Sequence, residues 1–158
     1  MAPVTEDMTE EEPELELLEA RRLIELGIIE QAESNYLEAR LCYEKSLKIY
    51  RTHGDLAGQA NSINGIAAIE RIQGNVREAM TQGKELLQTA RRLQNKGIEI
   101  AALSGLGLCY QQTGKHDEAI RCFLECIAIS RSLGDKTREG INLGNLAINY
   151  RSVGKTQK

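Results

Sequence analysis

The stretch that decides the fold is residues 100–139, IAALSGLGLCYQQTGKHDEAIRCFLECIAISRSLGDKTRE. In its first half Leu103, Leu106 and Tyr110 recur at helical spacing, and Gly114 then interrupts the pattern. A second apolar stripe follows at the same spacing, formed by Ala119, Phe123, Cys126 and Ile127. The stretch therefore predicts two helices that are joined by a turn at Gly114 and pack against each other.

The pattern repeats along the chain with a period of 40 residues. The positions that coincide are Glu38-Ala39, Glu78-Ala79 and Glu118-Ala119, then Arg51, Arg91 and Arg131, then Gly74, Gly114 and Gly154. Both prolines of the 158-residue chain lie at or before Pro13, so no proline interrupts the repeated part. A fixed period of this length indicates a solenoid in which successive helix pairs stack on one another.

These residues resemble those of tetratricopeptide repeats. The family's order and offsets are kept by Leu103, Leu106-Gly107, Tyr110, Gly114, Ala119 and Phe123, and in the last copy by Leu143, Leu146-Ala147 and Tyr150. The resemblance covers residues 14–158 and implies an all-α fold, a right-handed α-solenoid of antiparallel helix pairs. The implied repeats lie at about 20–59, 60–99 and 100–139, followed by the first helix of a fourth at 140–154.

Two departures from the family pattern are informative. The period is 40 residues, whereas the usual repeat has about 34, and Arg51, Arg91 and Arg131 stand where the family commonly has proline. The longer version is similar to the repeats of adaptor proteins that orient the mitotic spindle and of some ciliary proteins. HEAT and armadillo repeats have periods of about 40–47 residues, but they do not account for the spacing of the Gly/Ala and Tyr/Phe residues.

Charge divides the chain into two parts. Residues 1–19 hold eight acidic and no basic residues, whereas residues 20–158 carry twenty basic and fifteen acidic ones, giving a formal net charge of −3 overall. We expect residues 1–13 to form an acidic disordered leader, either solvated or folded back over a basic groove. The basic residues are spread along the chain, so no nucleic-acid partner is expected.

The sequence carries no signal for secretion or membrane insertion. The N-terminus lacks a basic start and an apolar core, and the longest mostly apolar stretch, residues 97–110, is too short to span a bilayer. The four cysteines, Cys42, Cys109, Cys122 and Cys126, suit a reducing compartment in which buried thiols stay free. We expect no membrane partner and a cytoplasmic protein, and the resemblance extends this to cytoskeletal or ciliary association.

The resemblance implies that the first helices of the pairs line a concave, peptide-binding groove. The groove residues expected here are Asn61, Asn64, Ala68, Arg71, Ser104, Leu108, Gln111, Asn145, Ile148 and Arg151. The middle of this surface is apolar, so the carboxylate clamp that chaperone-binding members build from asparagine is not supported. An apolar floor with a polar rim favours a peptide or helix with apolar and acidic residues. The alternative is that an internal helix, including the acidic leader, packs on the floor.

The second copy of the repeat lacks two large side chains. Glu70 stands where a first-helix aromatic is expected, and Gly83 stands where Tyr43 and Phe123 occur in the other copies. Side chains from adjacent repeats are expected to fill the gap. The alternative is an indented site that receives a side chain of a partner.

The C-terminal helix offers a second candidate surface. Leu143, Leu146, Ala147 and Tyr150 are expected to face the place of a missing second helix. A terminal repeat normally carries a polar outer face, so either the array continues or this face pairs with another protein or a second copy. A homodimer through the C-terminal helix is one of these possibilities.

Catalytic and metal-binding patterns are missing from the sequence. His53 and His116 fall at separate turns, and Cys109, Cys122 and Cys126 occupy positions expected in the core. No nucleophile, base and orienting residue occur together, so we expect no enzyme activity, no cofactor and no metal. The favoured function is a non-enzymatic scaffold or adaptor that binds other proteins. The alternatives are a regulatory sensor domain that controls an enzyme and a structural subunit of a ciliary or cytoskeletal complex.

Overall fold

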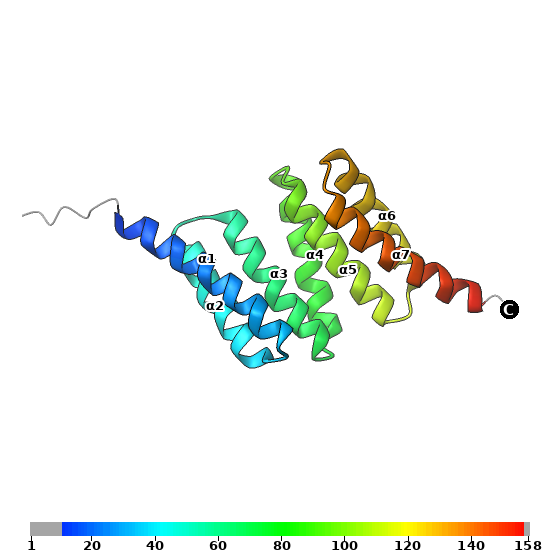
Figure 1. The fold of residues 1–158 in the computed structure, drawn as a ribbon, viewed down its shortest axis with the longest axis horizontal. Coiled ribbons are helices and arrows are strands. Elements are labelled where there is room, and N and C mark those ends of the chain that lie inside the picture. Colours follow the sequence, from blue (N-terminus) through cyan, green and yellow to red (C-terminus); the bar gives the residue numbers. More distant parts are fainter. Residues whose placement is uncertain (1–10, 157–158) are drawn as a thin grey trace, which may run out of the picture. The chain divides into compact units, whose positions relative to one another are not determined.

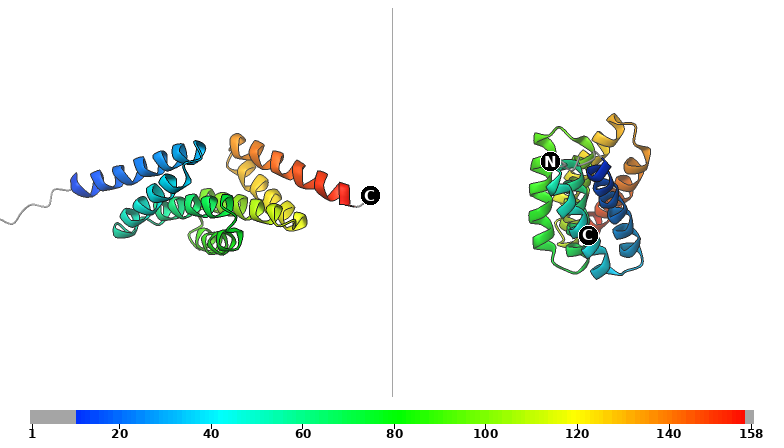
Figure 2. Two further views of the ribbon diagram at one scale, coloured as in Figure 1. Left: turned by 90° about the horizontal axis from the view of Figure 1, so that it is seen from below. Right: turned by 90° about the vertical axis from the view of Figure 1, so that its left-hand side faces the viewer.

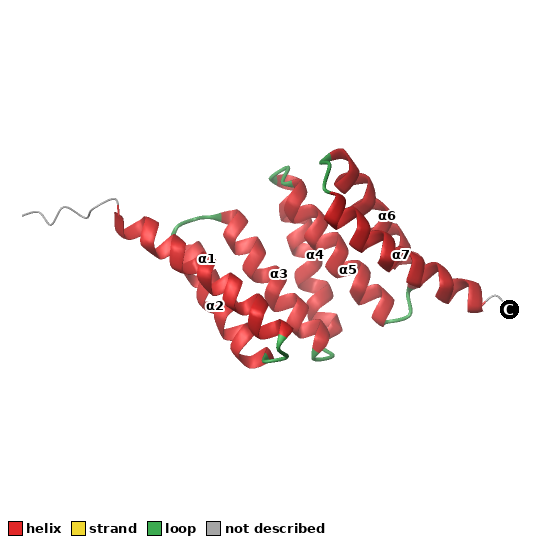
Figure 3. Ribbon diagram, in the orientation of Figure 1, coloured by secondary structure: helices red, strands yellow, loops and turns green. Residues whose placement is uncertain are grey.

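The structure, a computed structural model, describes residues 11–156, all of whose regular elements are helices (Figures 1 and 3). Seven helices occur in this range: α1 (Glu11–Ala32), α2 (Tyr36–Thr52), α3 (Leu56–Ile72), α4 (Val76–Arg92), α5 (Lys96–Gln112), α6 (His116–Ser132) and α7 (Lys136–Thr156). No strand is present between residues 11 and 156. The predicted all-α fold of three helix pairs and one extra helix is confirmed.

Helix starts recur at the period seen in the sequence. The first helices of the second to fourth pairs begin at Leu56, Lys96 and Lys136, and the second helices begin at Tyr36, Val76 and His116. The first helices thus start before the expected boundaries at 60, 100 and 140. Side-chain caps explain this, because Oδ1 of Asp55, Asn95 and Asp135 accepts from the main-chain N–H of Gly58, Ile98 and Arg138, respectively.

Helix α1 begins inside the region that we expected to be a disordered leader. Glu11, Glu12 and Glu14 lie in its first turn, where their charges favour the positive end of the helix dipole. Pro13 is tolerated there because the first turn has no use for its missing N–H. Residues 11–13 are therefore helical, and the rest of the expected leader, residues 1–10, lies outside the described residues.

Each turn between helices contains one residue in the left-handed region of backbone space. These residues follow one another every 20 positions: Ser34, Gly54, Gly74, Gln94, Gly114 and Gly134, with φ between 52° and 90°. Glycine adopts this conformation without penalty, whereas Ser34 and Gln94 adopt it at some cost. The shared turn geometry explains why the period holds where the turn glycine is replaced.

The helices fall into two compact units, residues 1–62 and 63–158, and α3 contains the division between them. In the first unit α1 packs on α2. The ring of Tyr43 lies against Gly27, so closely that a Cβ on Gly27 would be 2.8 Å from the Cε1 atom of the ring. The hydroxyls of Ser46 and Ser62 are 2.7 Å apart in the buried contact between α2 and α3.

In the second unit each helix from α4 to α7 packs on the next. Figure 2 shows α6 and α7 running side by side in this unit. One core cluster joins α6 to α7 through Ala119, Phe123, Ile127 and Leu146, and another joins α5 to α6 through Ile100, Leu103 and Cys126. Leu146 is thus buried against α6, which corrects the expectation that it faces a missing helix. Burial of such side chains is the main source of stability in a stacked array.

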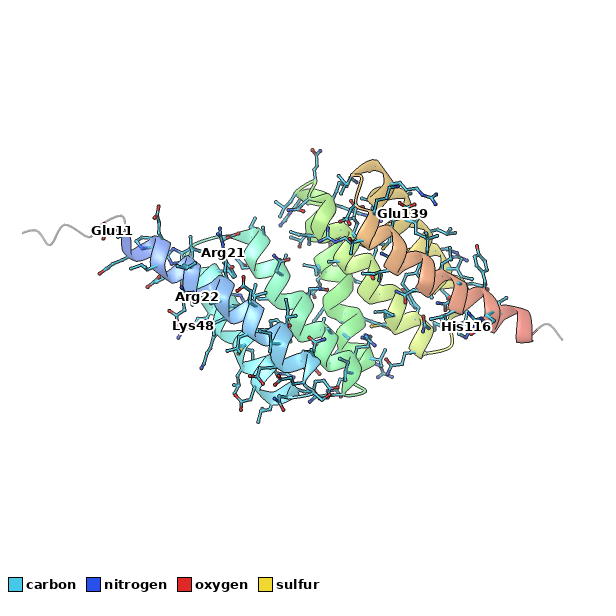
Figure 4. The ribbon with its side chains drawn as sticks, in the orientation of Figure 1. Glu11, Arg21, Arg22, Lys48, His116 and Glu139 are labelled. Carbon is cyan, nitrogen blue, oxygen red and sulfur yellow. The ribbon has the colours of Figure 1, made fainter. Side chains whose placement is uncertain are left out.

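Ion pairs join the helix pairs at equivalent places. Glu99, buried at the start of α5, accepts hydrogen bonds from Arg91 and Lys96 at 3.1 and 2.7 Å. Glu139, at the start of α7 (Figure 4), accepts equivalent bonds from Arg131 and Lys136. Each glutamate thereby links the end of one helix pair to the start of the next.

Helix α7 runs through Gly154, which the sequence pattern placed at a turn. Gly154 aligns with Gly74 and Gly114, both of which have positive φ, but its own φ is not in that region. Glycine accepts helical angles as well as left-handed ones, so the residue type alone does not end a helix. The helix therefore extends past the boundary at residue 154 that we expected.

Candidate functional site

A hollow of about 230 Å³ lies in the second unit. Its lining comes from four helices: Asn64, Ala67, Ala68 and Arg71 of α3, Ala79, Gly83 and Leu86 of α4, Ile100, Ala101, Ala102, Ser104, Gly105, Leu108 and Cys109 of α5, and Arg138, Ile141 and Asn142 of α7. Most of the lining is apolar or small, and a few polar side chains stand among these groups. This composition is typical of a site that binds an apolar group and orients it by a few hydrogen bonds.

The hollow coincides with a missing aromatic ring. Equivalent positions in the second helices hold Tyr43, Gly83 and Phe123, and the facing positions in the first helices hold Gly27, Ala67 and Gly107. In the third pair Phe123 is completely buried, and a Cβ on Gly107 would lie 2.7 Å from its Cε1 atom. In the second pair Gly83 supplies no side chain, and Gly83 and Ala67 both line the hollow.

A neighbouring repeat covers part of the space at Gly83. A Cβ on Gly83 would lie 3.0 Å from Cγ and Cδ2 of Leu106, which reaches α4 from α5. A side chain from the adjacent repeat therefore approaches this position, as we expected. It does not fill the whole gap, because Gly83 also lines the hollow.

Asn142 places an unsatisfied hydrogen-bond acceptor in this lining. Its side chain is only 2% exposed, and its Nδ2 atom donates to the main-chain oxygen of Arg138 at 2.9 Å. Because that oxygen can only accept, the amide nitrogen must face it, which fixes the orientation of the amide. Oδ1 of Asn142 is buried and has no hydrogen-bond partner among the described residues. A buried acceptor of this kind favours a ligand that brings a donor.

The charge at the hollow is positive. Arg71 and Arg138 both line it, and none of the described lining residues is acidic. Arg138 is 3.4 Å from Oδ2 of Asp135, whereas Arg71 forms no ion pair within the described part of the chain. Burial raises the pKa of the Cys109 thiol and the charge of Arg71 opposes that rise, so Cys109 is a neutral part of the wall.

Half of the expected groove residues meet at this hollow. Asn64, Ala68, Arg71, Ser104 and Leu108 line it, together with Ala101 and Ile141, which have the same register on α5 and α7. The first-helix stripe read from the sequence therefore identifies one continuous surface in the second unit. Whether this surface binds a peptide stays a prediction.

The other expected groove residues lie elsewhere. Asn149, which is buried, donates to Oε1 of Gln111 and to the main-chain oxygen of Asn145, both at 2.8 Å. Gln111 thus holds α7 against α5, whereas the bond to Asn145 lies within α7. Ile148 and Arg151 are exposed on α7, and Asn61 is exposed on the part of α3 that belongs to the first unit.

Reading the sequence missed Arg138 and Asn142. Asn142 falls in register with Ser62 and Ala102, which are both buried. An asparagine at a position that is otherwise small and buried was the available signal, because buried polar groups demand a partner. Arg138 carries no such signal, since its register partner Ile98 is a buried apolar residue.

The last helix carries exposed apolar side chains. Leu143 and Tyr150 of α7 are 41% and 52% exposed. Beside Tyr150, Asn149 contacts the start of α6, where Nδ1 of His116 (Figure 4) is 2.9 Å from Oδ1 of Asn149. Self-association through the exposed residues of α7 stays a prediction, which sedimentation of the purified chain would test.

Cys42, Cys109 and Cys126 are buried in the core, and Cys122 is partly buried. All four are free, and burial raises the pKa of Cys122 to about 11 and that of Cys126 to about 12. Thiols with such pKa values are poor nucleophiles and poor metal ligands near neutral pH. Within residues 11–156 no three histidine, cysteine or acidic side chains gather around a possible metal position. Over the same range no helix has the length and apolar character needed to cross a bilayer.

Comparison with protein families gives a clear result for the fold. The model of the tetratricopeptide repeat matches residues 18–92 and 98–158. Proteins with these repeats are typically non-enzymatic scaffolds that bind other proteins. A search of curated proteins finds no match. The resemblance to spindle-orientation and ciliary proteins therefore stays a prediction.

Proposed function

Since this chain belongs to the tetratricopeptide repeat family, we propose that it is a non-enzymatic adaptor that binds a peptide segment of a partner protein. The binding surface is the hollow of the second unit with the first-helix residues around it. The peptide carries an apolar residue and at least one acidic residue. Such an adaptor holds an assembly together by binding and needs no chemistry of its own.

One observation supports this proposal above the others. The hollow combines apolar walls with two arginines, Arg71 and Arg138, and with the unpaired acceptor of Asn142. An apolar side chain, a carboxylate and a main-chain N–H are the three groups that satisfy such a lining, and a peptide brings all of them. Asn64 and Ser104 add two further polar side chains for the peptide backbone.

Selection of peptides from a random displayed library on the purified full-length chain tests the proposal. We expect the selected peptides to combine an apolar residue with aspartate or glutamate. Their dissociation constants, measured by fluorescence anisotropy, should rise at least about tenfold in an Arg71→Glu variant, because the charge that meets the carboxylate is reversed. Arg77→Glu is the matched control, since Arg77 is exposed on α4 and does not line the hollow.

Two results would contradict the proposal. The first is a selection that yields no peptide with affinity above that for a scrambled-sequence peptide. The second is equal weakening by Arg71→Glu and Arg77→Glu, which would indicate a general effect of charge. An Arg151→Glu variant shows in addition whether the bound peptide continues along α7, as the expected groove does.

The narrower statements about assembly and location stay predictions. A regulatory sensor domain and a structural subunit of a ciliary or cytoskeletal complex both use the same protein-binding surface. The cytoplasmic location expected from the sequence suits the four free cysteines. Fluorescence microscopy of the tagged chain in cells would test the location directly.

A further inference from the structure

The second helix pair lacks a ring that the first and third pairs have. A phenyl or phenol ring fills the space between the helices in the first and third pairs, and in the second pair Gly83 leaves a hollow of about 230 Å³. An apolar cavity of about 150 Å³ in a protein interior is large enough to bind benzene. The hollow therefore has room for one aromatic or branched side chain, which is the group that the repeat itself lacks.

We propose that this hollow is a pocket for a single apolar anchor residue of the partner peptide, which takes the place of the missing ring. The inference rests on the proposed function and names the residue class that the site selects. The anchor is leucine, isoleucine, methionine or phenylalanine, because the walls are built by Leu86, Ile100, Leu108 and several alanines. A charged or short anchor would leave these walls exposed to water or empty.

The unpaired oxygen of Asn142 specifies how the anchor is held. Asn142 is 2% exposed, and its Oδ1 atom lacks a donor among the described residues. A main-chain N–H of the peptide next to the anchor supplies this donor. The bond converts a buried unsatisfied acceptor into a satisfied one, and this favours a peptide over a purely apolar ligand.

The two arginines specify the residues beside the anchor. Arg71 on α3 and Arg138 on α7 line the same hollow, and no described lining residue balances them there. Arg138 already has Asp135 at 3.4 Å, so Arg71 is the stronger candidate for a carboxylate of the peptide. An acidic residue next to the apolar anchor therefore completes the motif.

A ring-restoring variant tests the pocket. Gly83→Phe would rebuild the ring of the third pair, and Ala67→Gly removes the Cβ that would collide with it, as Gly107 does beside Phe123. Leu106, whose Cγ and Cδ2 atoms lie 3.0 Å from a Cβ at Gly83, has to shift to admit the ring. The double variant Ala67→Gly/Gly83→Phe should then fill the hollow at some cost in stability. The variant Thr81→Phe, which places the same ring on the exposed face of α4 away from the hollow, is the matched control. Circular dichroism and thermal melting check the fold of both variants.

The probe is a fluorescein-labelled peptide selected on the full-length chain from the displayed library. We expect the double variant to weaken its binding about tenfold to a hundredfold, and replacement of its anchor by alanine to do the same. The Thr81→Phe control should bind within about twofold of the wild type. Asn142→Leu should weaken binding about threefold to tenfold, because it removes one hydrogen bond while keeping the size of the side chain.

The outcomes separate this inference from the proposed function. If peptides are selected but the double variant binds them as the wild type does, the pocket is wrong and the adaptor function stands. If no peptide is selected, the proposed function fails with it. If the double variant does not fold, Ala68→Leu, which narrows the hollow from α3, gives the same test, and unchanged binding to it overturns the pocket.

A peptide of residues 1–13 of the same chain distinguishes a partner from the acidic leader. Added in trans, it should leave the binding of the selected peptide unchanged. If it displaces the selected peptide at similar concentrations, the hollow is occupied by the chain's own leader and the external anchor is overturned.

Discussion

The second and third helix pairs share every helix boundary of the period, but they differ at a pair of facing positions. In the third pair Phe123 is buried against Gly107, and in the second pair Gly83 faces Ala67. The first arrangement closes the space between the helices, and the second leaves a hollow. A change at these facing positions thus accompanies the difference between a closed repeat and one that borders a candidate binding site.

Loss of the ring in the third pair should have the largest effect. Phe123→Ala removes a completely buried ring that packs with Ala119, Ile127 and Leu146. We expect the free energy of unfolding to fall by about 3–5 kcal/mol, measured by urea denaturation. Leu124→Ala on the exposed side of α6 is the control and should change it by less than about 0.5 kcal/mol. A loss below about 1 kcal/mol for Phe123→Ala, which is at the low end of the effects of ordinary mutations, would show that the ring contributes little to the packing of this helix pair.

A smaller loss is expected when the third pair is given the alanine of the second. Gly107→Ala places a Cβ 2.7 Å from Cε1 of Phe123, and overpacking of this kind costs about 1–3 kcal/mol. In a Phe123→Ala background the collision is absent, so the same substitution should be neutral or stabilising. An equal loss in both backgrounds would place the strain somewhere other than the ring. Denaturant unfolding of the wild type, the two single variants and the double variant measures this difference.

The ion pair between the second and third pairs should contribute less. Burial alone raises the pKa of Glu99, but hydrogen bonds from Lys96 and Arg91 outweigh it and hold the pKa below its ordinary value of 4.5. Glu99→Gln should lower the free energy of unfolding by about 1–2 kcal/mol at neutral pH, because one charged hydrogen-bond partner of each cation is lost. Glu139→Gln, at the more exposed junction, should cost less.

The same carboxylate gives a testable dependence on pH. Because the pKa of Glu99 is lower in the folded chain than in the unfolded one, its contribution is complete above its ordinary value of 4.5 and is lost as the pH falls through the folded pKa. The Glu99→Gln variant should therefore lose less stability than the wild type on acidification through this range. Parallel pH dependences in thermal melts of the two proteins would show that Glu99 contributes nothing to the junction.

The smallest expected effect is a gain in stability. Gln94, in the turn between the second and third pairs, has a φ of 52°, whereas Gly114 and Gly134 occupy the equivalent turns around the third pair. Gln94→Gly should raise the free energy of unfolding by about 1 kcal/mol by removing left-handed strain. Gly114→Ala is the inverse control and should lower it by a similar amount. A melting temperature that does not rise in Gln94→Gly would contradict the strain at this turn.

The sequence alone predicts the repeat and part of the site. The helix pairs and the period follow from spacing, because an apolar side chain must recur once per turn to be buried. The first-helix stripe with Asn64, Ala68 and Leu108 follows from the resemblance to tetratricopeptide repeats. The start of α1 was missed, since acidic residues next to a proline are typical both of a tail and of a helix N-terminus. The role of Gln111 was missed as well, because it depends on Asn149, a partner on a different helix.

The sequence pattern does not predict which residues of α7 line the hollow, and the reason is physical. Asn142 and Arg138 lie on the fourth first helix, whereas Gly83 lies on α4. Their proximity depends on how far each repeat rotates relative to the last, and spacing within one repeat does not contain that rotation. Gly83 was recognisable as a missing side chain, but the groups that surround the resulting space were not.

Chemical labelling of the buried cysteines can measure local unfolding of the protein. Thiol reagents react with the thiolate, and burial raises the pKa of Cys126 to about 12 and also raises that of Cys42. Modification therefore has to wait for a local unfolding event that exposes the sulfur. Because the buried Cys42 belongs to the first unit and the buried Cys109 and Cys126 belong to the second, the order in which mass spectrometry detects these labelled cysteines reveals which unit opens first.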